Sequence, residues 1–76
     1  MGIVEATYVL TKGFPGAEKF GLISQMNRAS VSIPSNIAEG SGRDSEKDYR
    51  HLLRLALGSC FELATQLLIS IKLELV

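Results

Sequence analysis

The pattern of apolar and polar positions in residues 20–39 predicts an amphipathic α-helix. Side chains that recur at steps of three and four share one face of a helix. The apolar face consists of Met26, Ala29, Ile33 and Ile37. Pro34 lies inside this segment and removes one helical hydrogen bond, so we expect packing against other helices to hold the segment helical. Glycines at positions 40 and 42 end the helix,.

A polar stripe runs beside the apolar one at the same spacing. Its members are Gln25, Arg28, Ser32, Asn36 and Glu39. Ser and Asn are weak helix formers that compete for backbone hydrogen bonds, and a solvated face is more often built from Lys and Glu. The composition of the stripe therefore favours a partly buried polar network; the alternative is an ordinary surface face.

A short helix is predicted before this segment, over residues 3–12. Gly13 follows as a terminating residue that can adopt a positive φ, and we expect Phe14 to fold back on Val9. Pro15 cannot continue the helix, so residues 15–19 are expected to form a turn.

A third helix is predicted over residues 45–73, with Ser45 as its N-cap and Asp48 three residues later,. Its heptad seam consists of Tyr49, Leu53, Ala56, Cys60, Leu63 and Leu67,. A second apolar row consists of Leu52, Leu55, Phe61, Leu68 and Ile71. So wide an apolar surface must be covered on two sides. Because the first helix is too short to cover it, we expect the chain to associate with copies of itself.

These elements define an all-α, single-domain protein, an antiparallel helical bundle spanning residues 1–76. The connection after Gly40 is short, so the second and third helices form an antiparallel hairpin. Folding the hairpin brings the polar stripe toward the third helix. We expect an Arg28–Glu62 ion pair near the helix contact, with Gln25 and Gln66 close by.

Composition narrows the partners and the compartment. The 76 residues are 46% hydrophobic and carry a formal net charge of zero, so bulk charge provides no attraction to nucleic acid or to an anionic membrane. The lone Cys60 cannot form an internal disulfide, which fits a reducing cytoplasm. The first residues do not combine a basic segment with a following apolar segment, so we expect no export. Glu62 and Gln66 interrupt the apolar residues 55–71, so we interpret this stretch as a buried helix and expect no membrane association.

Catalysis has little support in the sequence. Cys60 lies on the heptad seam, where an inert buried thiol is favoured over a nucleophile. His51 has no set of ligands at metal-binding spacing around it, so a solvated histidine is favoured. The acidic residues at positions 44, 46 and 48 are explained by helix capping,. We therefore expect a non-enzymatic protein without a catalytic, cofactor or metal site.

A row of basic residues is the second candidate site. It consists of Arg43, Lys47, Arg50 and Arg54, spaced by four, three and four. Arginines at this spacing can follow a phosphate backbone and bind it in bidentate fashion. The alternative is a solvated charged face, because acidic residues lie among these positions.

Three stretches of the chain carry a resemblance to a known family. They are FGLISQMNRASVSIPSNIAEGSGR, SEKDY and LALGSCFELATQLLIS, and the resemblance around them covers about residues 8–71. In this order they resemble the bacterial four-helix-bundle proteins encoded in intervening sequences of 23S ribosomal RNA genes, which are related to accessory proteins of diversity-generating retroelements. The resemblance implies a helical bundle and, from characterised relatives, a ring-shaped homopentamer. Asn27 and Ser30 depart from the usual family residues, and the chain is expected to be truncated at both ends, lacking part of the first helix and the fourth.

Two functions remain open at this stage. The first is a structural, self-associating module of unknown biological role. The second is an RNA-binding or reverse-transcriptase accessory protein that uses the basic row; those relatives are markedly basic, whereas this chain is neutral.

Overall fold

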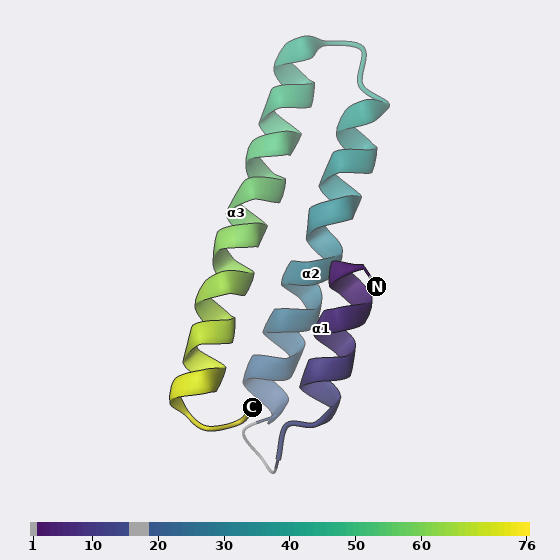
Figure 1. Ribbon diagram of the computed structural model, residues 1–76. Helices are drawn as coiled ribbons and strands as arrows, with labels where there is room; N and C mark the ends of the chain where they lie inside the picture. Colours follow the sequence, from purple (N-terminus) through teal and green to yellow (C-terminus); the bar gives the residue numbers. More distant parts are fainter. Residues whose placement is uncertain (1, 16–18) are drawn as a thin grey trace.

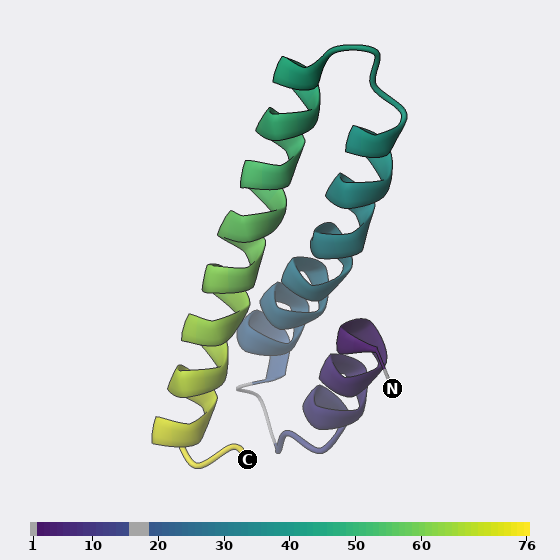
Figure 2. The same ribbon diagram turned by 45° about the horizontal axis from the view of Figure 1, so that its top comes forward.

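The computed structural model describes residues 2–15 and 19–76, with the side chains of residues 19 and 20 left out, and consists of three helices (Figure 1). They are α1 (Ile3–Lys12), α2 (Lys19–Ser41) and α3 (Glu46–Lys72). α2 and α3 run antiparallel as a long hairpin, and α1 lies beside the first half of α2 (Figures 1 and 2). No strand is present in the described residues. The predicted all-α fold is confirmed.

The helix ends agree closely with the sequence prediction. α1 matches residues 3–12, and α2 and α3 differ from their predicted limits by one or two residues. Ser45 caps α3, because its hydroxyl accepts a hydrogen bond of 3.0 Å from the backbone N–H of Asp48. Pro34 lies inside a continuous α2, so tertiary packing outweighs its helix-breaking tendency.

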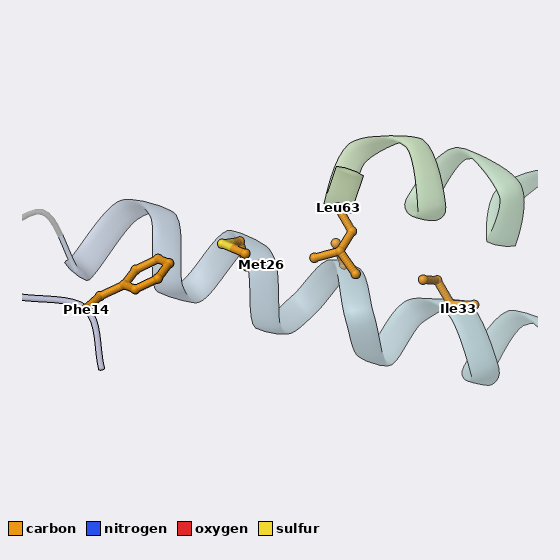
Figure 3. Packing of buried hydrophobic residues seen from close by; sticks show 5 residues of the cluster. Phe14, Met26, Ile33 and Leu63 are labelled. Atoms are coloured by element: carbon orange, nitrogen blue, oxygen red, sulfur yellow. The ribbon is translucent and has the colours of Figure 1, made fainter. Parts of the chain in front are cut away.

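The connection after α1 differs from the prediction in two respects. Gly13 has a φ of −86° in the right-handed region instead of a positive φ. Phe14 does not fold back on Val9. Val9 is exposed, whereas Phe14 is 1% exposed and enters the core (Figure 3). Tertiary burial of a large ring outweighs the local contact. The predicted turn over residues 15–19 lies mostly outside the described residues.

The core follows the apolar stripe of α2. The buried cluster consists of Phe14, Met26, Ala29, Ile33 and Leu63, and Figure 3 shows how these side chains line up along α2. The fourth member of the predicted stripe, Ile37, is 42% exposed, because it lies beyond the short α1. Leu75 also packs on the cluster, after the chain turns back at Glu74, which has a φ of 58°.

Two close approaches fix the neighbours of α2. Beside the connection between α2 and α3, a Cβ on Gly40 would lie 2.9 Å from Cδ1 of Tyr49 and 3.3 Å from Cβ of Leu52. Glycine therefore allows α2 and α3 to meet there. On the α1 side, the Thr11 hydroxyl donates a 3.0 Å hydrogen bond to Oδ1 of Asn27.

Candidate functional site: two uncovered faces of the helical hairpin

The first face lies on α3 and is apolar. We define the apolar face as the exposed residues Tyr49, Leu53, Leu57, Phe61, Leu67, Leu68 and Ile71. Phe61 is 66% exposed, Leu68 60% and Leu57 55%. The sequence predicts a buried helix here, covered in part by other copies of the chain. Within one chain these residues are exposed, because α3 turns a different part of its surface to α2.

The register of α3 explains the exposure. The residues that α3 buries are Leu52, Ala56, Leu63, Gln66 and Ser70. Of the predicted heptad seam, Ala56 and Leu63 are buried, whereas Tyr49, Leu53 and Leu67 remain more than one-third exposed. Apolar residues surround most of the helix circumference, so periodicity alone does not show which third of the surface meets α2.

By length and composition, α3 would be able to cross a membrane. Among the described residues it is the one helix with that property, and 22% of its most apolar 18-residue stretch is buried within the chain. Glu62 and the buried Gln66 lie in the middle of this apolar stretch.

A groove between α1 and α3 continues the apolar face. It has a volume of about 320 Å³. Its walls and floor are formed by Ile3, Ala6, Thr7, Leu10, Met26, Cys60, Leu63, Ala64 and Leu67. Cys60 is half-buried and unpaired in this groove, which agrees with its predicted place among apolar residues.

The second face is polar and combines residues of α2 and α3. Ser32 and Ser59 form a hydrogen bond between their hydroxyl groups across the two helices. The Asn36 amide donates a 2.8 Å hydrogen bond to the Ser32 carbonyl oxygen. One turn or more farther along, the Gln66 amide donates a 3.3 Å hydrogen bond to the Glu62 carboxylate. Ser32 and Asn36 are half-buried, as a partly buried network requires.

The predicted Arg28–Glu62 ion pair is not formed. Both side chains are exposed, and the ion pair found within the described residues is Arg43–Glu39, at 2.6 Å. Gln25 does lie near Glu62 and Gln66, since all three border one hollow of about 560 Å³. The structure thus places most of the predicted polar residues on one face but joins them in two separate clusters.

Glu39 is directed to the basic row instead of the polar network, through its pair with Arg43. The other three members of the row, Lys47, Arg50 and Arg54, are exposed on α3. Their spacing of three and four places them on one side of the helix. The described residues contain no group of three or more His, Cys, Asp or Glu side chains arranged to hold a metal ion.

Sequence reasoning missed Ser59 as a partner of Ser32. A signal was present, because Ser59, Glu62 and Gln66 are spaced by three and four and so form a polar stripe on α3 that matches the stripe on α2,.

The fold and its uncovered faces define a small helical-bundle protein built on one antiparallel hairpin. The family model of the 23S rRNA-intervening sequence protein matches residues 1–76. The chain therefore belongs to this family, as its sequence resemblance predicted. A comparison with curated proteins gave no match.

Proposed function

We propose that the protein is a non-catalytic helical module that assembles with copies of itself through the apolar face of α3. The observation that carries the proposal is the exposure of seven large apolar or aromatic side chains on one helix of the hairpin. Soluble monomers rarely expose a contiguous apolar patch of that size without using it.

The size of the face fits a second copy. The seven side chains are 37% to 66% exposed, and at several tens of Å² each they together offer on the order of 500 Å². A stable protein interface buries about 800 Å² on each partner. The groove beside α1 adds apolar surface to the same side of α3. The family resemblance leads us to expect five copies in the assembly.

The test replaces Leu57 and Leu68 together by lysine, and sedimentation velocity measures the mass of the assembly. Both side chains are more than half exposed and lysine is a good helix former, so the fold of each chain is retained. Wild-type protein is expected to sediment as a multiple of the 8.3 kDa chain. The double variant is expected to lose that assembly, because charged residues cannot be buried without partners.

Val9→Lys is the matched control, since Val9 is 63% exposed on α1, away from the apolar face. It should leave the assembly unchanged. Wild-type protein that is helical and monomeric at about 100 µM would contradict the proposal, and so would a double variant with the wild-type mass. Flotation of the wild-type protein with lipid vesicles in place of self-association would point to a membrane as the occupant of the face.

A second candidate function, an RNA-binding or reverse-transcriptase accessory role, is favoured by the exposed side formed by Lys47, Arg50 and Arg54. Three phosphate contacts predict a log-log salt slope of about −2 to −3. Fluorescence anisotropy with structured RNA should then show binding that Arg50→Glu with Arg54→Glu abolishes. Lys12→Glu with Arg28→Glu changes the net charge equally and should retain binding. Flat anisotropy at low salt would leave self-association as the function.

A further inference from the structure

The groove between α1 and α3 is an apolar surface that one chain leaves uncovered. α1 and α3 each pack on α2 but not on one another within the described residues, and the groove of about 320 Å³ lies between them. The buried Met26 and Leu63 border it, and its α3 side is formed by Cys60, Ala64 and Leu67. Because apolar surface in contact with water is unfavourable, an apolar group of matching size is expected to fill the groove.

The same helix carries a row of projecting apolar side chains. Leu57, Phe61 and Leu68 are the three most exposed members of the apolar face, at 55%, 66% and 60%. Their spacing of four and seven residues places them in one row along α3,. We call this row the ridge, and it is about 17 Å long at 1.5 Å per residue.

The ridge and the groove match in size. A cavity of about 150 Å³ accepts one benzene-sized ring, so the groove of about 320 Å³ has room for about two side chains of that size. Leu57 and Phe61 are one helical turn apart, about 6 Å, and the α3 side of the groove from Cys60 to Leu67 is about 10 Å long. Two neighbouring side chains of a ridge therefore fit the groove of another copy.

The ridge and the groove point in different directions. Successive residues of a helix are about 100° apart, so Phe61 lies about 60° from Ala64 around α3, and Leu68 about 100° from Leu67. One copy can therefore insert its ridge into one neighbour while its own groove receives the ridge of another. Such a head-to-tail interface is heterologous and closes into a ring when its rotation allows, so it is compatible with the ring that the family resemblance leads us to expect.

The available area also favours head-to-tail contact. The apolar face alone offers on the order of 500 Å², whereas a stable interface buries about 800 Å² on each partner. A pairing of ridge with ridge about a twofold axis would stop at two copies and leave both grooves in water. Within a head-to-tail assembly each copy buries its ridge against one neighbour and its groove against the other, so more apolar area per copy is removed from water.

We propose that the ridge of one copy docks in the groove between α1 and α3 of the next copy, head to tail. The inference rests on the proposed function and deepens it, because it names the surface of the second copy that receives the apolar face of α3. It also gives α1 a role in assembly, since α1 forms one wall of the receiving groove. The residues of that wall are Ile3, Ala6, Thr7 and Leu10.

Blocking the groove tests the docking. Ala64 is exposed and lines the groove, so Ala64→Trp fills the groove with a large ring and leaves the ridge intact. This variant is expected to lose the wild-type assembly and sediment as a helical monomer. The variant with Leu57→Lys and Leu68→Lys retains the groove but lacks the ridge. An equimolar mixture of the two variants is expected to form a complex of two chains, because the one intact ridge enters the one intact groove and no further copy can add.

Sedimentation velocity with one variant fluorescently labelled measures the complex, and circular dichroism checks the helical content of each variant. Thr65→Trp is the matched control, because Thr65 is exposed one residue farther along α3 and borders a different hollow. It should assemble as the wild type does. An Ala64→Trp variant with the wild-type mass would overturn the docking, and so would a mixture of two helical variants that stays monomeric. In both cases a wild type that assembles and a monomeric lysine double variant would leave the proposed function standing.

Disulfide formation provides a second measurement that leaves the groove unblocked. Wild-type protein, with Cys60 in its groove, is mixed with a chain that carries Leu57→Cys and Cys60→Ala, and diamide oxidises neighbouring thiols to disulfides. Docking of ridge in groove is expected to join one chain of each kind. A chain with Val9→Cys and Cys60→Ala is the control and should give no such product, because Val9 does not line the groove. Disulfides only between two copies of the Leu57→Cys, Cys60→Ala chain would show ridge against ridge and overturn the docking.

Discussion

Replacing Pro34 by alanine is expected to raise the free energy of unfolding by about 2 kcal/mol. Proline inside a helix costs about 3 kcal/mol relative to alanine, and it leaves the carbonyl of Ser30 without its helical donor. Ser30 is fully buried, so water does not reach that residue easily. The loss of chain stiffening in the unfolded state returns about 0.4–1 kcal/mol of the gain. Urea denaturation followed by circular dichroism, at a fixed protein concentration, measures the change.

Ser35→Ala is the neighbouring control. The Ser35 hydroxyl donates to the Val31 carbonyl oxygen on the exposed side of α2, and its replacement should change stability by about 0.5 kcal/mol or less. A Pro34→Ala variant that is no more stable than wild type would show that the ring shapes α2 for packing against α3. In that case the stability of the hairpin would depend on proline geometry, contrary to our expectation.

The helices could be predicted from the sequence because their signals are local. Ser45 and Asp48 mark the start of α3, and the glycines after Glu39 mark the end of α2. These signals act over a few residues and depend little on the rest of the fold. The position of Phe14 could not be predicted in this way, because its burial depends on where the chain reverses and on which core it then reaches.

The sequence predicted which residues lie on the polar face, but it did not predict which of them pair with one another. Ser32 and Asn36 form hydrogen bonds near the helix contact, and Gln66 is buried, as a partly buried network implies. The ion pair expected between Arg28 and Glu62 depends on how two long side chains reach across a helix surface, which spacing does not determine. Glu39 found a nearer partner in Arg43, four residues along the chain,.

The two uncovered faces of the hairpin differ in chemistry. The apolar face of α3 would gain free energy from the burial of area, with little control of geometry. The polar face is joined within one chain by the hydrogen bond between Ser32 and Ser59, so its polar groups contribute to the contact of α2 with α3.

Replacing Phe14 by alanine is expected to remove most of the stability of the chain. Truncating a buried phenylalanine costs about 3–5 kcal/mol, and a 76-residue chain has a total of roughly 4–11 kcal/mol. Phe14 is 1% exposed and packs in the cluster that contains Met26 and Leu63. Its loss removes the side chain that holds the end of α1 against the hairpin. Urea denaturation at a fixed concentration should show a much lower midpoint.

Val9→Ala provides the comparison. Val9 lies on α1, five residues before Phe14, but its side chain is 63% exposed. Its truncation should cost less than about 1 kcal/mol. A wild-type midpoint for Phe14→Ala would mean that the α2–α3 hairpin, with its partner copies, is stable without the α1 anchor. A large loss of stability for Phe14→Ala with a small loss for Val9→Ala would show that the Phe14 ring holds α1 to the core. The periodicity of the sequence did not place this ring in the core.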